Sequence, residues 1–286
     1  MLSPEEEKYI FNRAYLPEHV LNLMIPVSEG DPSLTNGYLY FSKDNWMIFI
    51  GYPLGCGFTT QGLEDALNSA IKRHAPSKIW LIAPELPVSV SESCISRQSD
   101  LYYRLDIGGL EVRRDLMRAV RKAARGLRVI RGKNVSKEHE QLISEFIERE
   151  RPQTMIKNLF FSMSRYVSAS ESSVVLSAFD DRGCLTAFYV VDSGSAVFAT
   201  YVIGCYSKKN YAPHASDLLF FEMINLAKES GKSYINLGLG VNKGIRNFKE
   251  KWGGVPFMGY EFCEYKPSGR RINIISELLR GIESRP

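Results

Sequence analysis

The chain has little of what marks membrane-spanning, disulfide-rich or metal-binding proteins. No apolar run approaches the roughly 20 residues that a membrane-spanning helix needs. Its five cysteines are scattered and include no Cys-x-x-Cys pair, which predicts reduced thiols rather than a disulfide framework or a zinc site. Only four histidines occur, none spaced like a pair of ligands, so no metal is expected. The acidic start, without a signal-peptide pattern, predicts a cytoplasmic protein.

What is present is an ordinary globular composition with an uneven charge. The 286 residues are 44% hydrophobic and 24% charged, which is enough for a large core in one or two domains. The formal net charge is only +4, yet residues 110–133 contain nine Lys and Arg against two acidic residues. Arg114, Arg118, Arg121 and Arg125 recur at helical spacing and would share one face. That face is either simply solvated or contacts phosphates of a polyanion.

The order of expected elements repeats along the chain. Strand, strand, loop, helix and strand occur near residues 37–82 and again near 184–237. We therefore expect two α/β units, residues 1–126, ending in the basic helix, and residues 127–286. In the second unit we expect strands at 196–203, 233–237 and 257–265 and helices at 214–230 and 243–252. Ile272, Leu279 and Ile282 belong to an expected final amphipathic helix.

Residues 234–265 carry the most informative pattern. A short strand enters a turn with Gly238 and Gly240, and a short helix with Phe248 and Lys249 follows. Backbone N–H groups at such a helix start can bind an anion or a carbonyl group. The Lys249 ammonium could bind a phosphate or a developing negative charge, and Phe248 could stack on a base. The alternative is a surface helix whose Phe belongs to the core. The glycine spacing only faintly resembles a dinucleotide site.

A second group of candidates surrounds the expected helix at 214–230. Lys208 and Lys209 precede it, and two lysines beside a helix N-terminus suit a pyrophosphate. His214 at its start is a candidate base, and the Tyr206 hydroxyl could protonate a leaving group. Asn236 lies on an expected neighbouring strand. The alternatives are an exposed loop, a structural histidine and ordinary half-buried strands.

The order of elements resembles the GNAT acyltransferase fold, in which two adjacent strands separate beside a long helix. Here those strands would be 196–203 and 233–237, and the helix 214–230. Residues 244–254, Gly-Ile-Arg-Asn-Phe-Lys-Glu-Lys-Trp-Gly-Gly, resemble the Phe-Lys segment of FemAB-like aminoacyl- and acyltransferases. The basic helix at 113–125 is similar to their linker helix. Residues 50–55 resemble the Gly-x-Pro turn of tandem-GNAT enzymes such as lysylphosphatidylglycerol synthase.

The resemblance implies an α/β tandem GNAT-like fold with mixed, mostly antiparallel sheets flanked by helices. It implies an N-acyltransferase in which an amine attacks an acyl-CoA or aminoacyl-tRNA donor directly. The acceptor would be a small-molecule or peptide amine, and tRNA or an anionic lipid surface are the other candidate partners. The expected catalytic residues are Lys249, Tyr206 and His214, and the donor-binding residues are Phe248, Gly238, Gly240, Lys208, Lys209 and Asn236.

One departure keeps a second function open. The usual acetyl-CoA motif, Gln/Arg-x-x-Gly-x-Gly/Ala, is missing before the expected long helix, where residues 208–214 read Lys-Lys-Asn-Tyr-Ala-Pro-His. The alternative is therefore a non-catalytic GNAT-like module that binds an acylated or nucleotide ligand.

Overall fold

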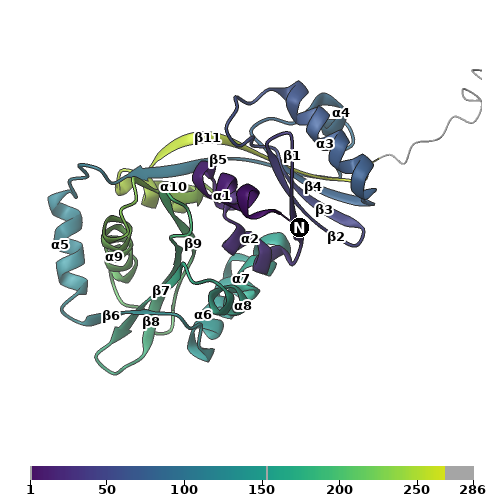
Figure 1. Cartoon of the computed structure of the whole chain (residues 1–286). Helices are drawn as coiled ribbons and strands as arrows, with labels where there is room; N and C mark the ends of the chain where they lie inside the picture. Colours follow the sequence, from purple (N-terminus) through teal and green to yellow (C-terminus); the bar gives the residue numbers. More distant parts are fainter. Residues whose placement is uncertain (1, 153, 268–286) are drawn as a thin grey trace, which may run out of the picture.

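Eleven strands form one continuous mixed sheet in the order β1-β2-β3-β4-β11-β5-β10-β9-β8-β7-β6 (Figure 1). The structure, a computed structural model, describes residues 2–152 and 154–267. The strands are β1 (Asp31–Thr35), β2 (Tyr38–Lys43), β3 (Trp46–Ile50), β4 (Lys78–Ala83), β5 (Ser96–Asp106), β6 (Leu127–Gly132), β7 (Ser173–Asp180), β8 (Leu185–Asp192), β9 (Phe198–Tyr206), β10 (Tyr234–Leu239) and β11 (Val255–Tyr265). The expected helix at 272–282 lies outside the described residues.

Helices cover both faces of this sheet. They are α1 (Pro4–Arg13), the 3-10 helix η1 (Pro17–His19), α2 (Leu21–Ser28), α3 (Thr60–His74), α4 (Val88–Ser91), α5 (Arg114–Ala123), α6 (Lys137–Glu150), α7 (Thr154–Phe161), α8 (Met163–Ala169), α9 (Ala215–Glu229) and α10 (Lys243–Lys251). Among the described helices, none combines the length and the apolar run needed to cross a bilayer.

Alternating side chains of β8 show how the two faces are used. Tyr189 packs in the cluster that α5, α9 and α10 form on one face, whereas Phe188 packs in the cluster of α2, α6, α7 and α8 on the other. Every residue of β8 is buried, as expected for a strand covered by helices on both sides. The long helix α9 and the helices α6 to α8 therefore lie on opposite faces of the second half.

The predicted repetition of elements is confirmed. β2-β3-α3-β4 and β8-β9-α9-β10 have the same order, and each ends in a parallel pair joined by a helix, β3 with β4 and β9 with β10. The mixed, mostly antiparallel α/β fold is confirmed as well. β11 lies between β4 and β5 and so joins the two halves in one sheet. The division at residue 126 stays a prediction.

Two expectations differ from the structure. The helix expected to run to Gly126 ends at Ala123, because the chain enters strand β6 at Leu127. The expectation of reduced thiols is wrong for Cys94 and Cys263, which form a disulfide with Cα atoms 5.6 Å apart. The pairing was hidden because 169 residues separate the two cysteines in sequence and only strand β11 brings them together.

Candidate functional site

Strands β9 and β10 begin as a parallel pair and then separate. Their register covers three positions, Tyr234 with Phe198, Ile235 with Ala199 and Asn236 with Thr200. Beyond Thr200, β9 pairs only with β8 among the described strands. The equivalent pair in the first half, β3 with β4, stays in register over all five residues of β3. The predicted separation is therefore confirmed, and the second half has it while the corresponding strands of the first half do not.

The last shared position is occupied by two buried polar side chains. Asn236 is 0% exposed and Thr200 is 2% exposed. Asn236 Oδ1 accepts a hydrogen bond from the backbone N–H of Gly238 at 2.9 Å. β10 bulges between these two residues, and Gly238 adopts a φ of 70°, which favours glycine. The Asn236 side chain thus fixes the turn at the point where β10 leaves β9.

The glycine turn itself has few free amides. The Gly240 N–H donates to the Leu101 carbonyl at 3.1 Å, and the Val241 N–H donates to Asp100 Oδ2 at 2.7 Å. The Gly238 N–H is engaged by Asn236, as described above. The amides of Gly238 and Gly240 are therefore both engaged within the protein, and anion binding at the N–H groups of the following helix start stays a prediction. Whether either glycine lies against a donor molecule stays a prediction.

Lys249 lies on the buried side of α10, and its side chain reaches the last residue of β10. Its side chain is 4% exposed, and its Nζ donates to the Leu239 carbonyl at 2.5 Å. The ammonium also lies 5.6 Å from the centroid of the Tyr103 ring. Burial lowers the pKa of Lys249 to about 7, and the charge of Asp100 partly opposes this shift. Ammonium and free amine are thus both accessible near neutral pH, so Lys249 can hold negative charge or exchange a proton.

Phe248 points towards α9 instead. Its ring packs edge-on against Phe220 with centroids 5.4 Å apart, and the Lys251 ammonium lies 4.8 Å above it. These contacts agree with the alternative interpretation, in which Phe248 packs against the hydrophobic core. Stacking of Phe248 on a nucleotide base stays a prediction.

A cavity of about 340 Å³ lies where the end of α5, the β7–β8 turn and the loop before α9 meet. Its lining includes the basic residues Lys122, Arg182 and Lys209. Arg182 is paired with Asp180, whereas no ion pair of Lys122 or Lys209 occurs within the described part of the chain. Both lysines are exposed, but only Lys209 belongs to this lining, and phosphate binding by Lys208 or Lys209 stays a prediction.

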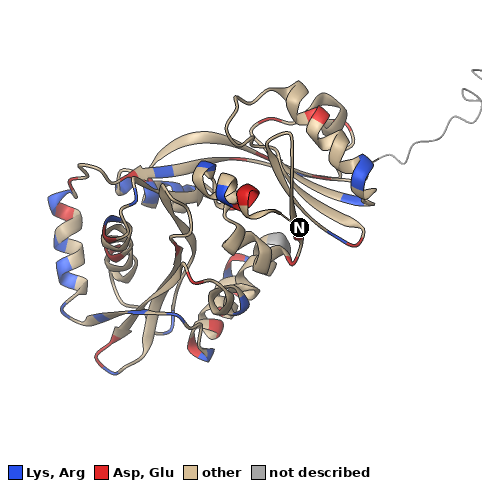
Figure 2. Cartoon of the chain, viewed as in Figure 1, with Lys and Arg blue, Asp and Glu red and all other residues tan. Residues whose placement is uncertain are grey.

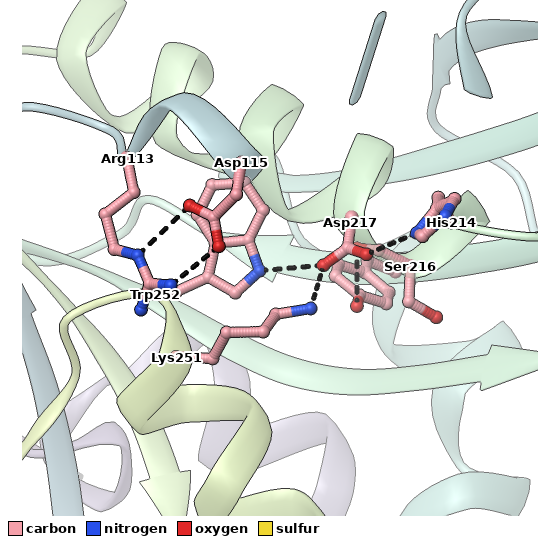
Figure 3. A network of polar contacts seen from close by, with 8 residues as sticks. Arg113, Asp115, His214, Ser216, Asp217, Lys251 and Trp252 are labelled. Atoms are coloured by element: carbon pink, nitrogen blue, oxygen red, sulfur yellow. Dashed lines mark hydrogen bonds and ion pairs between the residues drawn. The ribbon is translucent and has the colours of Figure 1, made fainter. Parts of the chain in front are cut away.

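The first turn of α9 carries a network that the sequence did not reveal (Figure 3). Asp217 accepts hydrogen bonds from Lys251 Nζ at 2.5 Å and Trp252 Nε1 at 3.1 Å. His214 Nδ1 lies 3.1 Å from the other carboxylate oxygen of Asp217. The sequence suggests only a helix-dipole role for Asp217, because two of its partners, Lys251 and Trp252, lie more than 30 residues away. His214 caps α9 with a left-handed φ of 64° and keeps an accessible side chain.

Tyr206 lies away from Asn236 and the turn after it. It stands six residues beyond Thr200 on β9, about 20 Å along a strand, and the Arg149 guanidinium lies 4.6 Å over its ring. The structure therefore gathers Asn236, the glycine turn and Lys249 at β10, and places Lys209 and His214 at the start of α9. Tyr206 does not belong to the first group and is not among the residues that line the cavity, and its catalytic role stays a prediction.

The basic helix α5 presents its charge to solvent (Figure 2). Leu116, Val120 and Ala123 pack it against the core. The opposite side exposes Arg114, Arg118 and Arg121, and Arg125 is exposed just beyond the end of the helix. Within the residues that the structure describes, none of these four arginines has an ion pair, whereas Arg113 pairs with Asp115. The charge of α5 is therefore available to a partner.

No protein-family model and no curated protein matches the chain. Solved structures do. L-PGS from Bacillus licheniformis is 14% identical, with a TM-score of 0.55 over 99% of this chain and 98% of that chain. FemX is 10% identical, with a TM-score of 0.58 over 98% of both chains. A tandem GNAT protein from the clavulanic acid biosynthesis pathway is 12% identical, with a TM-score of 0.53 over 93% of this chain and 95% of that chain. The chain therefore has the tandem GNAT fold of the FemAB-like type.

Proposed function

We propose that the chain is an N-acyltransferase that moves an acyl or aminoacyl group from an activated donor to an amine. The observation that carries this proposal is the separation of β9 from β10 beyond Thr200. Main-chain groups on the β9 edge that β10 leaves can hydrogen-bond a donor, and a fixed hydrogen-bonding edge stabilises charge on a reacting carbonyl. Holding donor and amine together supplies much of the remaining acceleration.

Direct attack of the amine is the route that the side chains support. Cys205 on β9 is buried, and burial raises its pKa, which keeps the thiol protonated and unreactive. Lys249, with a pKa lowered to about 7, is suited to hold negative charge or to take a proton near β10. We therefore assign Lys249 a role in the reaction and expect no covalent acyl-enzyme intermediate.

The donor is an acyl-CoA or an aminoacyl-tRNA. Lys122 and Lys209 line the cavity beside the N-terminus of α9, where two cations and a helix dipole favour phosphate groups of either donor. The exposed arginines of α5 adjoin this cavity and extend the positive surface beyond it. A polynucleotide can use that extension through phosphate contacts, as can an anionic lipid surface. L-PGS and FemX share the fold but do not decide the donor.

A transfer assay tests the proposal. Purified protein is incubated with acetyl-CoA, long-chain acyl-CoA or a mixture of aminoacyl-tRNAs in the presence of amino acids, amino sugars and short peptides. Mass spectrometry detects an acceptor whose mass has increased by the acyl or aminoacyl group. Transfer that requires the protein supports the proposal, and no transfer from any donor class rejects it.

A non-catalytic ligand-binding module is the second candidate, because the residues before α9, 208–214, lack the usual acetyl-CoA motif. A ligand bound by the native state raises the melting temperature. Stabilisation by CoA or an acyl-CoA without transfer to any amine would support the module.

A further inference from the structure

Asn236 and Thr200 each keep a buried polar atom without a partner. Among the described residues, five buried side-chain atoms lack a hydrogen bond, and two of them are Asn236 Nδ2 and Thr200 Oγ1. These two residues are register partners, and theirs is the last position that β9 and β10 share. An unpaired buried polar group costs about 1–3 kcal/mol. Two such groups side by side where the strands separate indicate a shared ligand.

The geometry fixes the chemistry that the pair can offer. Phe198 and Tyr234, two residues earlier on the same strands, stack at 5.3 Å and so share one face of the sheet. Strand side chains alternate, so Thr200 and Asn236 project to that face as well. The N–H of Gly238 requires an acceptor and takes Asn236 Oδ1, which leaves the Nδ2 amide hydrogens free. The pair therefore offers an amide N–H and a hydroxyl O–H.

A single oxygen with two lone pairs can accept from both groups. A carbonyl oxygen meets this description, and it does so better when negative charge develops on it. An ammonium group does not, because the free Nδ2 can only donate. In the proposed reaction, the oxygen that fits this description is the carbonyl oxygen of the thioester or ester donor.

We propose that Asn236 Nδ2 and Thr200 Oγ1 form a side-chain oxyanion site for the donor carbonyl. This inference rests on the proposed acyl transfer and adds two named donors to the main-chain edge of β9. As the amine nitrogen bonds to the carbonyl carbon, the π electron pair moves to the oxygen held by the two groups. When these two electrons re-form the C=O bond, the C–S or C–O bond breaks. The leaving sulfur or oxygen takes the bonding electrons and receives a proton from the attacking nitrogen.

Thr200→Val is the decisive variant, because it removes the hydroxyl and keeps the shape of the side chain. On whichever donor the wild type uses, we expect kcat to fall roughly tenfold to a thousandfold, the range for losing one oxyanion donor. Donor affinity should stay within about threefold, since the bond strengthens only in the transition state. Thr200→Ser keeps a hydroxyl and should retain most activity. Ser193→Ala is the matched control, since Ser193 Oγ is also buried without a partner but lies in the loop before β9.

The outcomes separate the two proposals. A wild type that transfers from no donor rejects the acyl transfer itself. A wild type that transfers, with Thr200→Val equally fast, overturns the oxyanion site alone. Melting temperatures accompany each rate, and Thr200→Ala replaces the valine variant if that protein does not fold. Asn236→Asp is a secondary test, because Asn236 also holds the Gly238 turn and its replacement can alter the backbone there.

Discussion

The Asp217 carboxylate accepts a hydrogen bond from Trp252 Nε1 at 3.1 Å, which ties the first turn of α9 to the end of α10. Lys251 Nζ donates to the same oxygen at 2.5 Å. α9 begins beside the cavity, and α10 carries Lys249. One buried carboxylate thus sets the relative position of the two groups of candidate residues.

Asp217→Asn should destabilise the protein by about 1–3 kcal/mol. The variant removes the charge that faces Lys251 and offers an amide where the native residue accepts from three donors. Urea unfolding at pH 7.5 measures the free energy of unfolding. Asp115→Asn, which alters an exposed ion pair on α5, is the control and should cost much less, because exposed ion pairs contribute little to stability. Equal losses in both variants would contradict the role assigned to Asp217.

Lys249→Met should stabilise the protein while it reduces turnover. The pKa of Lys249 is about 7 in the folded state and 10.5 ordinarily, so between these values the unfolded chain binds one more proton. The resulting penalty is full below pH 7 and disappears as pH rises towards 10.5. We expect the free energy of unfolding to rise by roughly 1–3 kcal/mol at pH 7 and by less at pH 9.5. The gain is smaller than the full penalty because the variant loses the hydrogen bond to the Leu239 carbonyl.

Turnover of the same variant should fall tenfold or more, a loss of about 1.4 kcal/mol in transition-state stabilisation. Opposite signs for stability and activity would mark Lys249 as a residue kept for function. Lower stability with unchanged kcat would instead make Lys249 a structural lysine.

Replacing Arg118 and Arg121 together by Ala should weaken binding of aminoacyl-tRNA and flatten its salt dependence. Each phosphate contact that is lost reduces the slope of log K against log salt by about 0.7–0.9. Filter binding at 50, 100 and 200 mM NaCl gives this slope. Lys72 and Arg73, exposed at the end of α3, supply the matched double-alanine control. If both double variants keep the wild-type slope, α5 does not contact the nucleic acid.

The sequence predicted what local patterns determine and missed what distant contacts determine. The Gly238 turn and the short helix with Lys249 follow from patterns within a few residues, whereas the separating strands were expected from the resemblance to the GNAT fold, and all three are present. The bonds of Asp217 to α10 and the disulfide of Cys263 depend on packing across more than 30 residues. The burial of Lys249 also depends on tertiary packing, since a lysine on a short polar helix gives no local sign of it.

His19→Gln should reduce the acid sensitivity of folding. The His19 ring is fully buried, and its Nε2 lies 3.0 Å from the Tyr52 carbonyl, so it is the donor there. Burial lowers the pKa of His19 from 6.5 to about 4. Between these values the unfolded chain binds the extra proton, so the contribution of His19 to stability is lost as pH falls from about 6.5 to 4.

Wild type should therefore exceed His19→Gln in stability at pH 7.5 by roughly 2–3 kcal/mol. This difference should shrink by about 2 kcal/mol at pH 4.5, because the pKa difference between the folded and unfolded states corresponds to about 1.4 kcal/mol per unit. Urea unfolding of both proteins at each pH gives the difference directly, and carboxylates that titrate in both proteins cancel from it. A difference that stays constant from pH 7.5 to 4.5 would mean that the folded protein protonates His19 as readily as the unfolded chain does.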